Sequence, residues 1–297
     1  MGVDLKAIRN RIISRLDGLE ARQLAAVESV VRNMHRKVDF RPGNTTELVG
    51  DAFREEMALF LVAHHALHER ALNKENFEYI FKQCLIASGD ADARLNPNQK
   101  QAKFDVEGGG YTWSLKTETG DSMSKNQVKV EKFTEALWIR DSLTAEDCAR
   151  NVRELVIPRL SDYERIVVLR ASRAGAFITY SLEEIPWMLL SSSLVSQTRP
   201  EIFSKAQRGK KVAKSFGADY LGADGGTRQF RMLLDTSVEK VRIWFALREC
   251  VHHGYWTLPG SAATDVLQFS TAAAAEIPRQ PDQHQQTSAT YQEEFPI

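Results

Sequence analysis

The sequence predicts an α/β protein in which a mixed central sheet is flanked by helices and preceded by a helical N-terminal segment. Three observations lead to this prediction. Apolar residues recur at helical spacing through most of the first ninety positions. After Gly89 the period changes to the alternation that is typical of strands. The second half of the chain contains several short runs that are rich in β-branched and aromatic residues.

The first elements are expected to be helices. Residues 1–40 carry apolar side chains at helical spacing, and the segment 41–44 (Arg-Pro-Gly-Asn) interrupts this pattern. A second helix is expected from Asn44 to about His68, because Asn44 is a good N-cap and Glu47 completes a capping-box-like arrangement. A third helix is expected over residues 74–87, ending at Gly89.

Strands are expected next, beginning with a β-hairpin. Residues 102–106 and 111–117 flank the turn Glu107-Gly-Gly-Gly110, whose glycines reach the positive φ angles of a tight turn. Two further helices are expected, from Ser124, whose capping box with Gln127 opens a helix to about Ile139, and from Thr144 to Val156. Two strand pairs complete the pattern, 165–170 with 176–182 and 230–234 with 240–247.

Composition limits the class of protein. Lys plus Arg and Asp plus Glu both number 39, so the formal net charge is zero, which disfavours a protein that holds nucleic acid by bulk charge alone. The three cysteines are widely spaced without a CxxC motif, which favours a reducing cytoplasmic location. The N-terminus lacks the apolar core of a signal peptide, and no apolar run approaches the ~20 residues that span a bilayer.

The expected hairpin carries the candidate catalytic residues. Asp105 lies on one arm, and Ser114, Lys116 and Glu118 alternate along the other, so these three share one face of the strand. Cross-strand neighbours lie about 5 Å apart, which brings Asp105 beside that face if the hairpin register allows it. Hydrolysis of a phosphodiester requires a divalent cation held by carboxylates, an activated water and positive charge near phosphorus. Asp105 is the expected metal ligand, and Lys116 is expected to orient the water or stabilise the transition state.

This pattern resembles the PD-(D/E)XK nuclease superfamily, in which an acidic residue on one strand precedes (D/E)-X-K on the next. The match covers roughly residues 44–140, with Phe104 in place of proline and Ser114 in place of the first acidic residue of the triplet. A branch of restriction endonucleases with Ser-X-Lys recovers the missing carboxylate from the following helix. The resemblance therefore implies a restriction-endonuclease-like fold and a Mg2+-dependent type II restriction endonuclease that cuts double-stranded DNA, with Ser114 marking the site.

The resemblance leaves the remaining carboxylates open. Glu131, in the helix expected after the catalytic strand, is the first candidate for the displaced metal ligand, and Glu118 is the second. The superfamily often adds a glutamate from the helix before the sheet, a role for which Glu47 or Glu55 is available. The implied organisation is an N-terminal helical segment (1–43), a nuclease domain with DNA-recognition insertions (44–260) and a tail poor in aliphatic residues (272–297).

DNA contacts are expected from a basic segment in the second half of the chain, because Lys and Arg neutralise phosphates and Arg and Gln read base edges. The expected DNA-binding residues are Lys205, Arg208, Lys210, Lys211, Lys214, Arg228, Gln229 and Arg231. A homodimer is expected, since cutting both strands of a symmetric site is simplest with two active sites. Two alternatives remain open at this stage, a non-catalytic DNA-binding protein and a repair or recombination nuclease on the same fold.

Overall fold

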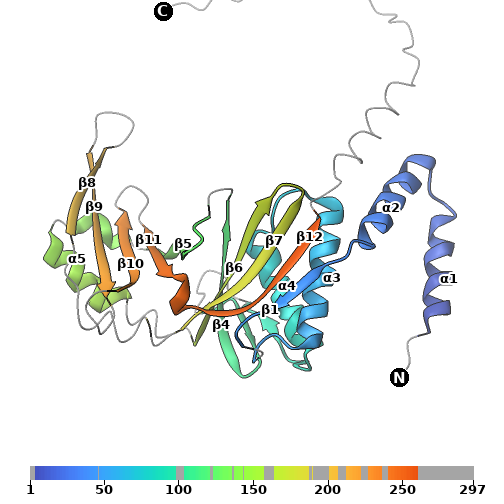
Figure 1. Ribbon diagram of the computed structural model, residues 1–297, viewed down its shortest axis with the longest axis horizontal. Coiled ribbons are helices and arrows are strands. Elements are labelled where there is room, and N and C mark those ends of the chain that lie inside the picture. Colours follow the sequence, from blue (N-terminus) through green and yellow to red (C-terminus); the bar gives the residue numbers. More distant parts are fainter. Residues whose placement is uncertain are drawn as a thin grey trace, which may run out of the picture.

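A computed structural model gives the structure of the protein. It describes residues 4–45, 47–97, 104–120, 123–135, 137–142, 144–156, 164–186, 189, 201–206, 212–221, 227–235 and 240–259. The expected N-terminal helices are present as α1 (Leu5–Leu16) and α2 (Ala21–Met34). They lie at one end of the molecule, with α2 beside α3 (Asp51–Leu67) (Figure 1). The expected C-terminal tail, 272–297, lies outside the described residues.

A mixed sheet forms the centre of the described structure. Within the described residues its strands follow the order β1-β12-β7-β6-β4-β3-β2. β4 and β6 run parallel, and the other neighbouring pairs are antiparallel. The strands are β1 (Asp39–Pro42), β2 (Arg94–Leu95), β3 (Val106–Gly108), β4 (Tyr111–Thr119), β6 (Arg165–Ala174), β7 (Phe177–Ile185) and β12 (Val251–Pro259).

Helices α3 and α4 (Lys74–Ala87) cover one face of this sheet (Figure 1). Their apolar stripes, which include Phe53, Met57, Phe77 and Phe81, pack against Trp113 and other strand residues. Asn73 caps α4 by accepting a hydrogen bond from the backbone N–H of Asn76 at 2.8 Å. This packing fixes the start of α4 against the sheet.

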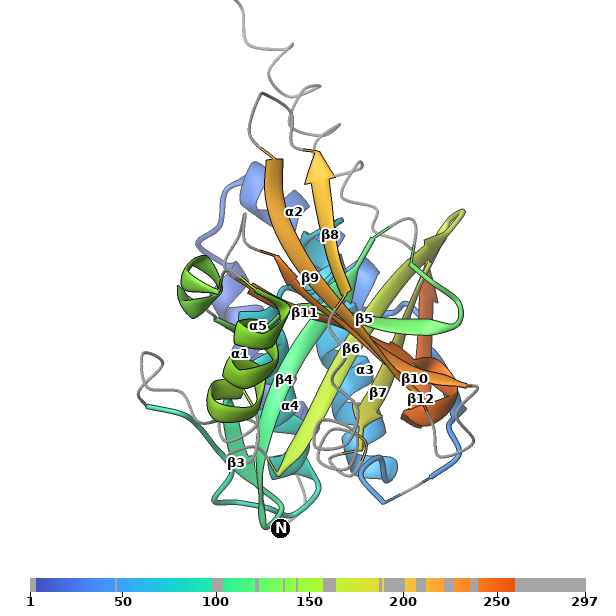
Figure 2. The same cartoon turned by 90° about the vertical axis from the view of Figure 1, so that its left-hand side faces the viewer.

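A second sheet covers the opposite face. Within the described residues it contains β5 (Gln127–Glu135), β8 (Glu201–Ala206), β9 (Val212–Leu221), β10 (Arg228–Asp235) and β11 (Lys240–Ala246), in the order β5-β11-β10-β9-β8. Its strands cross those of the first sheet, with α5 (Ala145–Asn151) to one side (Figure 2). The apolar core between the layers includes Ile166 and Val168 of β6, while Val167 and Leu169 face the helices. The central strand is therefore apolar on both faces.

Several short elements complete the chain. Leu137–Asp141 and Leu247–Glu249 form 3-10 turns. The π-helical turn Val152–Val156 continues α5, which begins with a capping box between Thr144 and Asp147. The predicted α/β class is confirmed, as are the helix over residues 74–87 and the strand pairs at 165–182 and 230–247.

One predicted helix is wrong, and another begins later than predicted. Gln127–Glu135 is the strand β5, because buried Val128 and Val130 alternate with more exposed neighbours and pair with β11, which outweighs the local capping signal at Ser124. The second helix begins at Asp51 rather than at Asn44. Asn44 extends the pairing of β1 with β12 instead, since its backbone N–H donates to the carbonyl of His252 at 2.9 Å.

Candidate active site

Asp105 and the β3–β4 hairpin form the core of the candidate site. Gly109 and Gly110 have φ angles of 63° and 80°, so they make the turn that the glycine run predicts. The pairing of Val106 with Trp113 places Asp105 opposite Ser114, and the backbone N–H of Asp105 donates to the carbonyl of Trp113 at 2.8 Å. The register therefore brings Asp105 beside the Ser-Leu-Lys segment.

The Asp105 carboxylate accepts from this segment. Its Oδ2 accepts a 2.6 Å hydrogen bond from the backbone N–H of Leu115, and it lies 3.7 Å from Nζ of Lys116. Lys116 Nζ also donates to Oγ of Ser114 at 2.8 Å. Ser114 is buried, and Lys116 and Asp105 are nearly so. The convergence of Asp105, Ser114 and Lys116 is thus a feature of the folded hairpin.

Helix α4 contributes a second carboxylate that the sequence analysis did not single out. Glu78 and Lys74 are one helical turn apart, and Nζ of Lys74 lies 2.9 Å from Oε1 of Glu78 and 2.8 Å from Oδ1 of Asp105. Lys74 therefore links the two carboxylates. The available signal was a Lys–Glu pair at i,i+4 spacing in the helix immediately before the hairpin.

The electrostatics of the site follow from burial and from these contacts. Burial lowers the pKa of Lys116 to about 8, although Asp105 favours its charged form. Burial raises the pKa of the Glu78 carboxyl, and its hydrogen bond to Lys74 opposes the shift. Burial also disfavours the ammonium of Lys74, but the charge of Asp105 and the hydrogen bonds to both carboxylates outweigh it and raise its pKa. The site thus holds two lysines of different acidity around one aspartate.

The donor set fits a hard divalent cation. Mg2+ prefers oxygen ligands and is commonly held by one or two carboxylates together with waters and substrate phosphates. Asp105 and Glu78 supply two carboxylates, and the ammonium of Lys74 already holds a positive charge between them. Both residues line a pocket of about 280 Å³. Among the described residues, no group of three or more His, Cys, Asp or Glu is placed to hold a metal ion.

The other predicted carboxylates lie in different surroundings. Glu118 is buried in an ion pair with Arg170 at 2.6 Å. Glu131 is on β5 and pairs with Arg242 at 3.0 Å. Glu47 lies 3.8 Å from Arg165, and Glu55 lies beside Arg54; both glutamates are exposed. Of the predicted carboxylates, Asp105 lies in the cluster with Lys116. The second carboxylate of that cluster is Glu78, which was not predicted.

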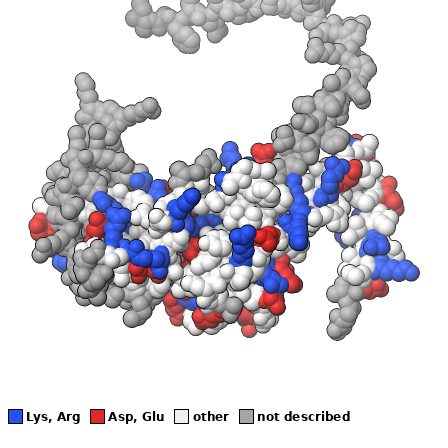
Figure 3. Space-filling view, in the orientation of Figure 1, with Lys and Arg blue, Asp and Glu red and all other residues white. Residues whose placement is uncertain are grey.

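The predicted DNA-binding residues cluster on the second sheet. Lys205 lies on β8 and Lys214 on β9, two strands that pair antiparallel. Arg208, Lys210 and Lys211 lie outside the described residues. Arg228, Gln229 and Arg231 are on β10, where both arginines lie within 3.6 Å of Asp219. Figure 3 shows Lys and Arg side chains over the region of β10, β11 and β5.

Comparison with known proteins now identifies the family. Residues 12–257 match the SmaI family, which is described as type II site-specific deoxyribonuclease. The chain belongs to this family. It is also 29% identical over 220 residues to the type II restriction enzyme SmaI from Serratia marcescens, an alignment that covers 71% of this chain and 81% of the relative. No solved structure matches the chain.

The family membership decides between the functions that the sequence left open. The chain is a sequence-specific DNA endonuclease of the restriction type, and neither a non-catalytic DNA-binding protein nor a repair nuclease. The matched residues include the whole β3–β4 hairpin, α4 and the second sheet. Among the described residues, no helix is long and apolar enough to cross a membrane.

Proposed function

We propose that this endonuclease hydrolyses double-stranded DNA with Mg2+ at a PD-(D/E)XK-like site formed by Asp105, Glu78 and Lys116. The observation that carries the proposal is the convergence of the three side chains, from the start of β3, from α4 and from β4. Asp105 and Glu78 would hold the cation. When bound, Mg2+ would neutralise charge on the scissile phosphate and favour the ionised form of the attacking water.

Lys116 is the proposed catalytic cation. With a pKa of about 8 it remains mostly protonated at neutral pH, so its ammonium is able to donate to a water or to a non-bridging phosphate oxygen. The water oxygen forms the new bond to phosphorus as the bond to the leaving oxygen breaks; the water releases a proton to solvent, the leaving oxygen takes one up, and negative charge on the phosphate develops next to Lys116. Ser114 positions this ammonium, because Lys116 Nζ donates to its hydroxyl at 2.8 Å.

The second carboxylate ligand is assigned to Glu78 in this proposal, with Glu131 and Glu118 as competing candidates. Contacts favour Glu78, since Lys74 bridges it to Asp105, whereas Glu118 and Glu131 are paired with arginines. Single Gln variants at the three positions separate these candidates. Glu78→Gln should cost orders of magnitude in cleavage rate, and normal cleavage by that variant would remove it from the site.

Lys116→Ala tests the catalytic role directly. The variant should fold and bind a short duplex with near-normal affinity but lose cleavage of plasmid DNA. Lys82→Ala is the matched control, because Lys82 is on α4 with its Nζ 4.7 Å from the ring of Tyr79. Cleavage by folded Lys116→Ala at the rate of the control would contradict the proposal.

We propose a homodimer as the form that cuts both strands. Helix α1 buries none of its residues, and Leu5, Ile12 and Ile13 are 75%, 53% and 53% exposed. A second copy is the simplest partner for cutting both strands, because a two-fold pair presents two active sites to a symmetric sequence. Light scattering of the protein with a duplex should give a dimer, and Ile12→Glu should yield monomers while Asn10→Glu does not. A wild-type monomer on the duplex would contradict this.

The proposed location is the cytoplasm. All three cysteines, Cys84, Cys148 and Cys250, are buried free thiols. Free thiols of this kind fit a reducing compartment, where DNA entering the cell also becomes accessible to the enzyme. Fractionation of a cell that expresses the protein should recover it with cytoplasmic markers, and recovery in a secreted fraction would contradict this location.

A further inference from the structure

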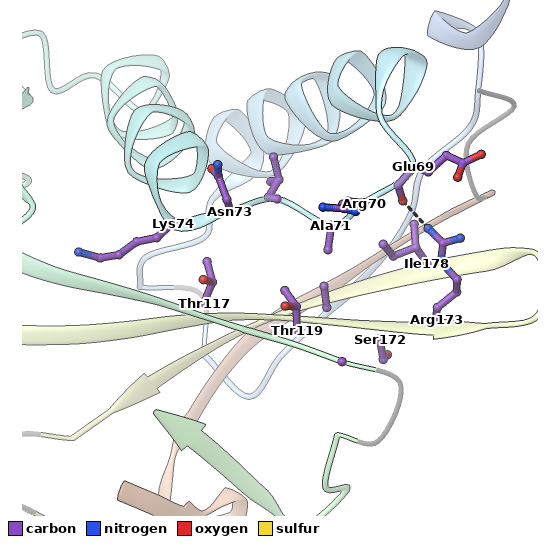
Figure 4. A pocket seen from close by; sticks show the side chains of 13 residues that line it. Glu69, Arg70, Ala71, Asn73, Lys74, Thr117, Thr119, Ser172, Arg173 and Ile178 are labelled. Carbon is purple, nitrogen blue, oxygen red and sulfur yellow. Dashed lines mark hydrogen bonds between the residues drawn. The ribbon is translucent and has the colours of Figure 1, made fainter. Parts of the chain in front are cut away.

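A pocket of about 700 Å³ lies next to the candidate active site. It is lined by residues 69–73 between α3 and α4, by Lys74 at the start of α4, and by the ends of β4, β6 and β7 (Figure 4). Lys74 lines this pocket and is also the residue whose Nζ bridges Asp105 and Glu78. Lys74 therefore belongs both to the lining of this pocket and to the catalytic cluster.

The lining has the chemistry of a phosphate site. Two cations besides Lys74, Arg70 and Arg173, come from opposite walls, and the hydroxyls of Thr117, Thr119 and Ser172 line the strand side. Phosphate oxygens are bound in proteins by Arg and Lys side chains and by Ser and Thr hydroxyls. The acidic residue of the lining, Glu69, lies at the end of the pocket farthest from Lys74 in Figure 4.

Buried hydrogen bonds hold the connecting segment in place. The backbone N–H of Leu72 donates to Oη of Tyr180 at 3.1 Å, and Tyr180 Oη lies 2.8 Å from Nε2 of His65. Nδ1 of His65 lies 3.0 Å from the carbonyl of His68, which fixes the proton on Nδ1. Nε2 then accepts from Tyr180, so the phenol both accepts and donates.

A second restraint acts at the far wall, where Arg173 donates to the carbonyl oxygen of Glu69. This contact places a guanidinium of β6 against the connecting segment. A site whose walls are held in this way loses little conformational entropy when an anion binds.

We propose that this pocket binds the sugar-phosphate backbone of the cleaved DNA strand beside the scissile phosphate, with Arg70 and Arg173 as the phosphate-binding residues. The proposal rests on the proposed active site, because Lys74 is what connects the two. Charge complementarity selects the occupant: the pocket presents cations and hydroxyls to a polyanion that the endonuclease must hold in register. Backbone contacts of this kind position the strand and carry no sequence preference.

The test measures duplex binding by Arg70→Gln in EDTA, so that no cleavage occurs. Removal of one phosphate contact should weaken binding about eightfold at 0.1 M salt and reduce the slope of log K against log salt by about 0.9. The loss should be the same for a cognate and an unrelated duplex. Arg32→Gln is the matched control, because Arg32 is exposed on α2 and pairs with Glu28.

Several outcomes would overturn the proposal. Unchanged affinity and salt slope in Arg70→Gln would do so, as would a loss confined to the cognate duplex, which would indicate base contact. Calorimetry with inorganic phosphate is a further test of the same variant. If Arg70→Gln lost phosphate binding but kept duplex binding, the pocket would be a small-anion site. Arg173→Lys, which keeps the positive charge, should weaken binding less than Arg173→Gln, and equal affinities in the two variants would contradict the assignment of Arg173.

The proposed backbone pocket and the proposed active site are tested by different measurements, duplex binding for the pocket and DNA cleavage for the active site. Binding in EDTA is measured without the metal and without cleavage. Normal cleavage by Lys116→Ala would remove the active site proposed above and leave the binding result to be judged alone. Conversely, unchanged binding by Arg70→Gln would remove the backbone pocket and leave the cleavage experiments unaffected.

Discussion

Acid sensitivity of the fold should arise from His65, which supports the segment that lines the backbone pocket. Burial lowers the pKa of His65 to about 4, and the charges of His64, Arg173 and Arg36 act in the same direction. The unfolded chain takes up this proton near pH 6.5, whereas the folded protein does so only near pH 4. The contribution of His65 to stability is therefore fully present above pH 6.5 and is lost as the pH falls from 6.5 toward 4.

The two pKa values set the size of the effect. Between pH 7 and pH 5 the free energy of unfolding should fall by about 2 kcal/mol through His65 alone. Urea denaturation at both pH values measures this fall in wild type and in His65→Gln, which should lack most of it. His35→Gln, at an exposed histidine, should retain it. Equal pH dependence in wild type and His65→Gln would refute the reasoning.

Two further predictions concern charge in and near the site. Lys74→Met should strengthen Mg2+ binding by the DNA-free protein about tenfold in calorimetry. The substitution removes a positive charge from between two carboxylates and with it a repulsion of at least ~1.4 kcal/mol between that charge and the cation. An affinity no higher than that of Lys82→Met would contradict this. Glu118→Ala should lower the free energy of unfolding by about 3–5 kcal/mol, because it leaves the buried Arg170 without its carboxylate. Unchanged stability with lost metal binding would instead place Glu118 in the metal site.

Local signals predicted much of the fold. The helix over 74–87 and the hairpin at 106–119 are set by near neighbours, such as the Asn73 cap and the positive φ angles of Gly109 and Gly110. The pairing of β1 with β12 joins residues more than two hundred positions apart, and nothing in the local pattern of either strand indicates its partner. The alternation in β5 was present in the sequence, but it competed with the capping signal of Ser124, whose Oγ accepts from the backbone N–H of Asn126 without starting a helix.

The candidate site was predictable in part for the same reason. Asp105 and Lys116 lie on two arms of one hairpin, so register alone brought them together. Glu131 was chosen because a helix was expected after β4, and the prediction of that helix was wrong. Glu78 reaches the site because α4 packs on the sheet, a tertiary contact that the spacing of Lys74 and Glu78 does not reveal.

Cleavage of plasmid and phage DNA with and without Mg2+, by wild type and by Asp105→Ala, Glu78→Gln and Lys116→Ala, tests the central claim most directly. The account predicts discrete fragments from wild type with Mg2+, none in EDTA, and losses of orders of magnitude in all three folded variants. Calorimetry should assign the losses in the first two variants to weaker metal binding in the presence of DNA. Discrete fragments in EDTA, or wild-type rates from a folded Asp105→Ala or Lys116→Ala protein, would contradict it.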